Sequence, residues 1–91
     1  MTFLDLLQKR FLDKSSFCRT KVIKVFKKLS FENHIPKDIY LDLFAKVIGR
    51  FKDQTIMVRK NALMLCQQLV HIFAIMFNVN TEQGERFLSH Q

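Results

Sequence analysis

Two aspartate–arginine pairs with the same spacing are the residues best suited to chemistry. Asp13 precedes Arg19 by six residues, and Asp53 precedes Arg59 by the same interval. Each arginine lies at the edge of the apolar stripe of an expected helix, where it needs a partner because an unpaired buried charge is costly. Each aspartate lies at the turn entering that helix, where its carboxylate can accept helix N–H groups and face an arginine of its own or an adjoining hairpin. We therefore predict a structural Asp/Arg ladder of Asp13, Arg19, Asp53 and Arg59 rather than an active-site ion pair.

Lysines follow the polar side of the segment that carries Arg19. Four of them spread over about 120° of the expected helix, and a fifth extends this basic ridge near a later turn: Lys21, Lys24, Lys27, Lys28 and Lys60. One interpretation is a solvated helix face. The other is contact with DNA phosphates, which would give sequence-independent affinity that falls steeply with salt. No recognition-helix or stacking-aromatic motif accompanies the ridge, so base readout is not expected.

The sequence lacks catalytic and metal-binding patterns. His34, His71 and His90 are scattered, and Cys18 and Cys66 stand forty-eight residues apart without a C-x-x-C pair. It also lacks H-E-x-x-H, G-x-S-x-G and Gly-rich phosphate-loop motifs. We expect no enzyme activity, metal, cofactor or small-molecule substrate. We expect both cysteines to be small buried hydrophobes on helix stripes.

Composition limits the chain to one small domain. Its 91 residues carry 15 Lys and Arg against 8 Asp and Glu, for a net charge of +7. A chain of this length supports one modest core, which excludes an enzyme with a separate cofactor domain. Only 2 Gly and 1 Pro accompany 48% hydrophobic residues, so long helices with few turns are expected. Residues 69–77 form the longest apolar stretch, and a membrane span needs about 20 residues. Residues 1–10 lack signal-peptide features, which favours reduced cytosolic or nuclear surroundings.

Apolar spacing predicts helices throughout and no strand. The first helix covers residues 3–11, and the second begins after a polar break with Ser15 or Ser16 as its cap. The third opens at Pro36, because proline is favoured in the first helical turn. The fourth runs over residues 56–76. Thr81 is a candidate cap for a short final helix.

The chain matches itself at an offset of forty residues. Residues 10–29 and 50–69 share five identical positions, where average composition gives about one or two. Apolar positions also coincide, and each copy ends one helix and begins the next at the same place. A two-helix period near 40 is typical of HEAT and armadillo α-solenoids. We predict an all-α solenoid of two HEAT-type helical hairpins plus a short C-terminal helix, in one domain over 1–91 with helical pairs at 2–31 and 36–77 and a divergent tail at 78–91.

Two stretches go beyond a general HEAT pattern, residues 10–26 and 48–65. The most specific part is Gly49-Arg50-Phe51-Lys52-Asp53 followed by Val58-Arg59-Lys60-Asn61-Ala62. From about Arg10 to Leu69, the sequence resembles the central HEAT region of the large HEAT-repeat subunits of condensin. Members of that family are far longer, and two repeats are fewer than the three or more that a solenoid usually needs, so we expect a fragment.

The resemblance implies a non-catalytic scaffold that binds the kleisin subunit and DNA and supports mitotic chromosome condensation. Such a scaffold acts in the nucleus, on the chromosome and in the cytoplasm, with no membrane, and ATP hydrolysis belongs to its SMC partners. The resemblance also implies that the ladder residues are structural pairs and that the basic ridge faces DNA. The alternative is a stand-alone HEAT-like adaptor that binds a partner peptide or helix without DNA. Salt-titrated DNA binding separates the two.

Overall fold

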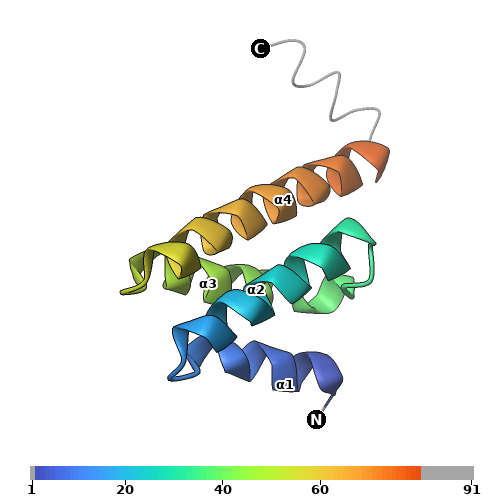
Figure 1. Cartoon of the computed structure of the whole chain (residues 1–91). Helices are drawn as coiled ribbons and strands as arrows, with labels where there is room; N and C mark the ends of the chain where they lie inside the picture. The colour runs from blue at the N-terminus through green and yellow to red at the C-terminus, as the bar shows by residue number, and fades with distance from the viewer. Residues whose placement is uncertain (1, 81–91) are drawn as a thin grey trace.

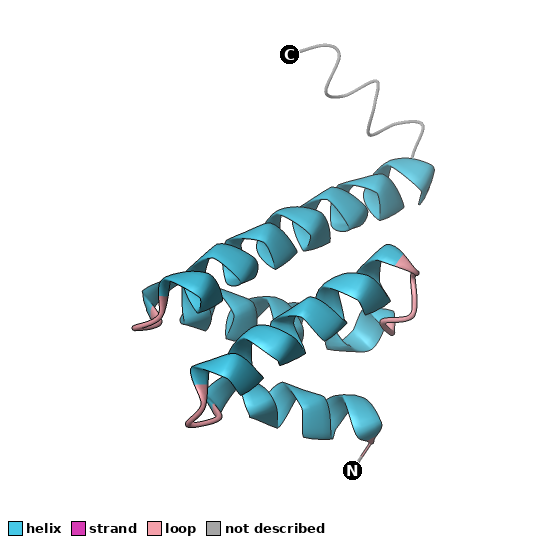
Figure 2. Cartoon of the chain, viewed as in Figure 1, coloured by secondary structure: helices cyan, strands magenta, loops and turns pink. Residues whose placement is uncertain are grey.

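The computed structural model describes residues 2–80, with the side chains of residues 2–76. This part of the chain is helical and contains no strand, which confirms the predicted all-α, HEAT-like class (Figures 1 and 2). The predicted final helix at Thr81 and most of the tail at 78–91 lie outside the described residues. The elements in order are α1 (Phe3–Lys9), the 3-10 turn η1 (Arg10–Leu12), α2 (Ser16–Phe31), the 3-10 turn η2 (Lys37–Ile39), α3 (Tyr40–Gly49), the 3-10 turn η3 (Arg50–Lys52) and α4 (Ile56–Asn80).

Polar side chains begin the first two helices. Thr2 and Asp5 form a reciprocal capping box on α1: the Asp5 N–H donates to Thr2 Oγ1 at 3.1 Å, and the Thr2 N–H donates to Asp5 Oδ2 at 3.0 Å. The bond from the Thr2 N–H to the Asp5 carboxylate lowers the pKa of Asp5. Of the two serines considered as caps for α2, Ser15 takes the role and accepts the Cys18 N–H at 3.4 Å.

The connection between α2 and α3 differs from the prediction. Asn33 has a left-handed backbone with φ of 59°, and the His34 N–H donates to the Leu29 carbonyl at 2.8 Å, which is the closure expected at a helix end. Pro36 does not open an α-helix. Its backbone is extended, with ψ of 142°, and it precedes η2, so that α3 begins only at Tyr40. The φ that the proline ring imposes suits an extended residue as well as a helical one, and ψ decides between them.

The forty-residue repeat is visible in the backbone. Each copy has an Arg-Phe 3-10 turn followed by an extended aspartate. The φ and ψ angles are −59° and 146° at Asp13 and −60° and 148° at Asp53. In both copies the aspartate N–H donates to the carbonyl of the arginine three residues earlier, Arg10 or Arg50, at 3.1 Å. The two turns therefore present their aspartates to the following helix in the same way.

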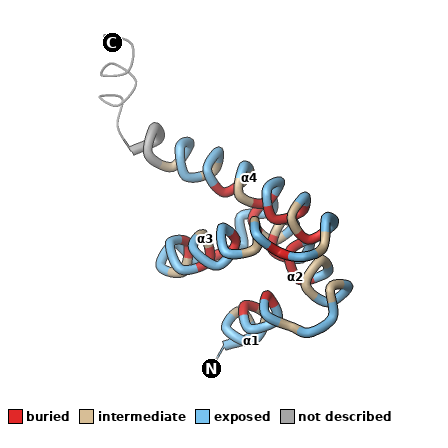
Figure 3. Tube along the Cα trace, turned by 90° about the vertical axis from the view of Figure 1, so that its left-hand side faces the viewer, coloured by how far each residue is buried: buried red, intermediate tan, exposed pale blue. Residues whose placement is uncertain are grey.

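The core lies mainly where α2 and α4 run side by side, with α3 packed against α4 and α1 below α2 (Figures 1 and 3). The rings of Phe11 and Phe26 stack with centroids 5.4 Å apart and tie η1 to α2. Burial of such side chains contributes about 1.5–3 kcal/mol each relative to exposure. The buried apolar residues are Phe11, Val22, Ile23, Phe26, Ile35, Tyr40, Leu43, Val47, Val58, Ala62, Leu65 and Leu69.

The expectation that both cysteines are buried is wrong for Cys18. Cys18 is exposed and Cys66 is half-buried, and both are free thiols. Position 18 corresponds to Val58 at the forty-residue offset, and Val58 is fully buried because α2 lies beside α4. No described element covers the matching side of α2. Burial raises the pKa of the Cys66 thiol.

The second helices of the two hairpins, α2 and α4, differ in length. α2 has 16 residues and α4 has 25, so α4 extends well past the segment that packs on α2. Despite its length, neither α4 nor any other helix in residues 2–80 has the apolar run needed to cross a bilayer.

Candidate functional site

A buried ion pair joins the two hairpins. Arg19 Nε donates to Asp53 Oδ2 at 2.7 Å, and Arg19 Nη2 donates to Asp53 Oδ1 at 3.1 Å. The Arg19 side chain is 13% exposed and the Asp53 side chain only 2%. This two-bond geometry matches the fork of a guanidinium to both oxygens of a carboxylate. We call this contact the seam pair.

Further hydrogen bonds fix both partners of the seam pair. Arg19 Nη1 donates to the carbonyls of Asp13 and Lys14 at 2.7 and 3.1 Å. Asp53 Oδ1 accepts the Thr55 N–H at 2.9 Å, and Arg50 Nη1 lies 3.3 Å from Oδ2. The pKa of Asp53 lies below its ordinary value of 3.8. Burial alone would raise this pKa, but the hydrogen bonds from Arg19 and Thr55 stabilise the charged carboxylate and have the larger effect.

The second copy repeats half of this arrangement. Arg59 Nη1 donates to the Asp53 carbonyl at 2.7 Å, as Arg19 does to the Asp13 carbonyl. Asp13 Oδ1 accepts the Ser15 N–H at 2.9 Å. This hydrogen bond is the main reason that the pKa of Asp13 is lowered. Each arginine thus bonds the main chain of the aspartate in its own hairpin. The carboxylate contact runs instead from Arg19 to the aspartate of the next hairpin.

Two glutamines outside the predicted set of site residues also bridge the hairpins. Lys46 Nζ on α3 donates to Gln8 Oε1 on α1 at 2.8 Å. Gln68 Nε2 on α4 donates to the Lys27 carbonyl at 2.6 Å and to Ser30 Oγ, both on α2. The burial of Gln8 could have been predicted from the sequence, because Gln8 follows Leu4 by one helical turn on the apolar face of α1.

The basic ridge borders a groove between α2 and α4. Lys21, Lys24, Lys28 and Lys60 are exposed, and Lys27 is half-buried. One hollow of the groove is lined by Ser16, Phe17, Thr20, Lys21, Lys24, Thr55 and Met57. A second hollow is lined by Lys24, Lys27, Lys28, Phe31, Asn61 and Gln68. Lys24 belongs to both, so the two hollows adjoin. We call them together the α2/α4 groove.

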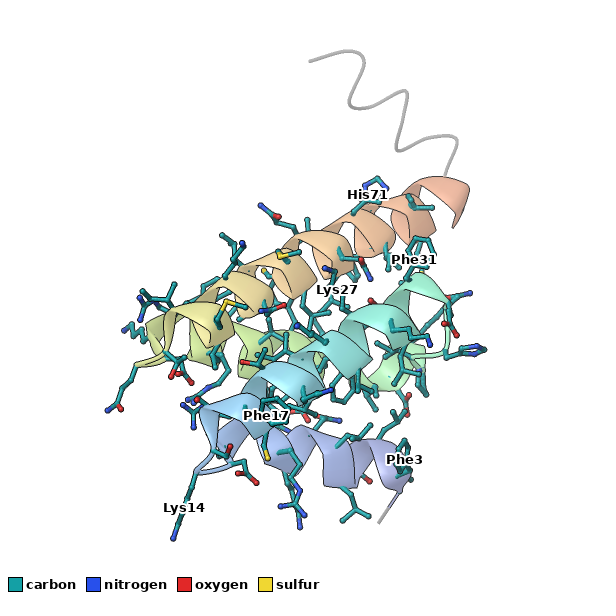
Figure 4. All side chains as sticks on the ribbon, in the orientation of Figure 1. Phe3, Lys14, Phe17, Lys27, Phe31 and His71 are labelled. Atoms are coloured by element: carbon teal, nitrogen blue, oxygen red, sulfur yellow. The ribbon has the colours of Figure 1, made fainter. Side chains whose placement is uncertain are left out.

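Two phenylalanine rings of this groove face solvent. Phe17 is 67% exposed near the start of α2, and Phe31 is 81% exposed at its end. Figure 4 shows these two rings with Lys27 between them, whereas Phe3 lies on α1. Lys21 Nζ lies 5.4 Å from the centroid of the Phe17 ring. The groove therefore combines cations with solvent-facing rings.

An apolar hollow lies between α3 and α4. The Tyr40 ring is buried, and its hydroxyl has no hydrogen-bond partner among the described residues. Burial raises the pKa of this phenol. The hollow is lined by Tyr40, Leu41, Phe44, Leu69, Val70 and Phe73. Within residues 2–80, no group of His, Cys, Asp and Glu side chains is placed to hold a metal ion.

The chain is similar in sequence to condensin complex subunit 1 of several organisms. No family model and no solved structure matches the chain. It is 38% identical over 80 residues to condensin complex subunit 1 of Schizosaccharomyces pombe, which covers 85% of this chain and 7% of that protein. It is 33% identical over 63 residues to the subunits of Mus musculus and Homo sapiens, which covers 69% of this chain and 4% of each of them. The chain spans less than a tenth of these relatives. By sequence, it is related to a short segment of condensin complex subunit 1.

Proposed function

We propose that this chain acts as a non-catalytic HEAT-repeat scaffold segment of a condensin complex in mitotic chromosome condensation. The observation that carries the proposal is the sequence relationship to condensin complex subunit 1 in three organisms. The helical hairpins and the seam pair between them support it, because stacked pairs of this kind form extended binding surfaces. The kleisin and SMC subunits would be its protein partners, and ATP hydrolysis would belong to the SMC subunits. Its site of action would be the nucleus and the chromosome, with a cytoplasmic pool.

The DNA-binding part of the proposal rests on the α2/α4 groove. A net charge of +7 attracts polyanions over the whole surface. The exposed ammonium groups of Lys24 and Lys28 line the groove on α2, and Lys60 is exposed on α4. The seam pair holds these two helices in one register, so the cations keep a fixed spacing. Phosphate contacts of this kind give affinity without sequence preference.

A salt titration of DNA binding tests this part. The full chain is titrated with a labelled 20-base-pair duplex of arbitrary sequence, and the dissociation constant is measured by fluorescence anisotropy over a range of KCl concentrations. We expect the variant Lys24→Gln/Lys28→Gln to reduce the salt slope by about 2, since each phosphate contact contributes about 0.9 on B-DNA. The control Lys9→Gln/Lys37→Gln carries the same net charge but changes exposed lysines outside the groove, and it should keep the slope.

The stand-alone adaptor remains the second candidate. The observation that favours it is the apolar hollow between α3 and α4, which suits an apolar side chain of a partner peptide or helix. No DNA affinity at low salt, with the basic ridge intact, would favour this candidate over DNA binding. Copurification of the kleisin subunit with the tagged chain tests the condensin assignment independently of DNA.

A further inference from the structure

We propose that the α2/α4 groove binds single-stranded DNA, with Phe17 and Phe31 stacking on bases and the lysines between them contacting phosphates. This inference rests on the proposed function and names the form of DNA that the groove accepts. Phe17, Lys21, Lys24, Lys28 and Phe31 fall within about 80° of arc on α2, at 100° per residue. They therefore form one stripe along the helix and not a scatter of exposed groups.

The two rings are largely exposed to solvent. Phe17 and Phe31 are 67% and 81% exposed, and neither belongs to the buried core. Exposing two large rings on a stripe of lysines gives nothing to the core, because each ring leaves most of its apolar surface in water. Flat exposed rings beside cations are the parts from which single-strand platforms are built, since every base has a face that can stack.

The spacing along α2 fits a short single strand. Phe31 follows Phe17 by fourteen positions, which at 1.5 Å per residue is about 21 Å along the helix. Lys21, Lys24 and Lys28 occupy the interval between the rings, and Lys21 Nζ lies over the Phe17 ring at 5.4 Å. A nucleotide stacked at Phe17 therefore has a cation beside its phosphate. Site sizes of about 4–16 nucleotides are usual for single-strand grooves.

A duplex cannot use the rings in this way. Its bases are stacked on one another and turned inward, so a duplex presents mainly phosphates to a shallow groove. An acidic peptide could use the lysines, but it carries no set of flat faces for the two rings. The groove should therefore distinguish single strands from duplexes through Phe17 and Phe31 and treat both alike through its lysines.

The experiment compares four probes on the full chain by fluorescence anisotropy at fixed salt: a twelve-nucleotide oligothymidylate, an abasic oligomer of equal length, a twelve-base-pair duplex and poly-glutamate. We expect Phe17→Ala/Phe31→Ala to weaken oligothymidylate binding by at least about tenfold, from the loss of two stacking contacts. Its binding of the abasic oligomer and of the duplex should change less than about twofold. Phe17→Tyr/Phe31→Tyr should restore binding of the oligothymidylate, and Phe3→Ala, which removes an equally exposed ring on α1, should behave as the wild type.

Three outcomes would overturn the inference. One is an abasic oligomer that binds the wild type as tightly as oligothymidylate. Another is an equal loss of single-strand and duplex affinity in the alanine variant. The third is poly-glutamate binding that falls with the two rings as oligothymidylate binding does. If the duplex binds with the expected salt slope while the rings have no effect, DNA binding stands and single-strand stacking is refuted. Circular dichroism melting of the alanine variant checks that both exposed changes leave the fold intact.

Discussion

Arg19 and Asp53 meet across the two hairpins through two hydrogen bonds of 2.7 and 3.1 Å. They are 34 residues apart in sequence, and each is held by further bonds within its own hairpin. The pair thus links the start of α2 in the first hairpin to the turn before α4 in the second. Because the Asp53 side chain is only 2% exposed, the carboxylate depends on cationic partners, Arg19 at 2.7 Å and Arg50 at 3.3 Å, for compensation of its charge.

Removal of the two ladder arginines should have unequal effects. Arg19→Ala leaves the buried Asp53 carboxylate without its main partner, and we expect it to lower the free energy of unfolding by about 3–5 kcal/mol. Arg59→Ala removes one bond to a carbonyl and should cost about 1 kcal/mol. Urea unfolding followed by circular dichroism measures both. Equal losses of unfolding free energy in the two variants would show that the contact of Arg19 with the Asp53 carboxylate does not contribute to stability.

Acid should weaken the seam. The pKa of Asp53 is lowered in the folded chain, so its contribution to stability is fully present above the unfolded value near 3.8. That contribution is lost as the pH falls through the lower folded value. Asp53→Asn should be less stable than the wild type at pH 7, and the difference should shrink below about pH 4. Unfolding free energies from pH 2 to 7 provide the measurement. A difference that stays constant over this range would contradict the prediction.

The Gln68 bridge offers a test with an adjacent control. Gln68→Ala removes the donor to the Lys27 carbonyl and to Ser30 Oγ, and we expect a loss of about 1–2 kcal/mol. Gln67→Ala changes the neighbouring exposed glutamine and should be neutral within about 0.5 kcal/mol. Thermal melts of the two variants are compared with the wild type. The bridge is unimportant if the two melts coincide.

Helix α2 carries both a core ring, Phe26, and a surface ring, Phe31. Phe26 is fully buried and stacks on Phe11, so Phe26→Ala should cost about 3–5 kcal/mol and could unfold so small a domain. The milder change Phe26→Leu keeps the measurement possible. Phe31→Ala should alter stability by less than about 0.5 kcal/mol. A large loss at Phe31 would indicate that its ring is packed and unavailable for ligand.

Sequence patterning predicted the helices because apolar spacing and caps act locally. The cap at Ser15 and the turns at Asp13 and Asp53 depend on residues close in the chain. The offset of forty residues can be read directly by comparing the sequence with itself. The start of α3 was misplaced at Pro36, because a proline fixes φ but leaves ψ to its surroundings. The predicted resemblance to condensin was confirmed by the comparison with known proteins. This resemblance depends only on the amino-acid sequence, so it needs no knowledge of how the helices pack.

The remaining features depend on which helix lies on which side of another. A helical wheel places Arg19 at the edge of an apolar stripe, but it does not tell whether the nearest carboxylate belongs to Asp13 or Asp53. The same wheel places Cys18 and Phe17 near the stripe of α2, although no described element packs on that side. The exposure of Phe31 has the same origin. Packing between hairpins, which the local pattern does not encode, decides each case.

The most direct test of the account is a pair of double-mutant cycles on unfolding free energy. One cycle combines Arg19→Ala with Asp53→Ala, and the other combines Arg19→Ala with Asp13→Ala. We predict a coupling of about 2 kcal/mol between Arg19 and Asp53, and a coupling near zero between Arg19 and the Asp13 side chain. The reverse pattern, with Arg19 coupled to Asp13 and independent of Asp53, would contradict the account, because the ion pair would then lie within one hairpin and not between the two.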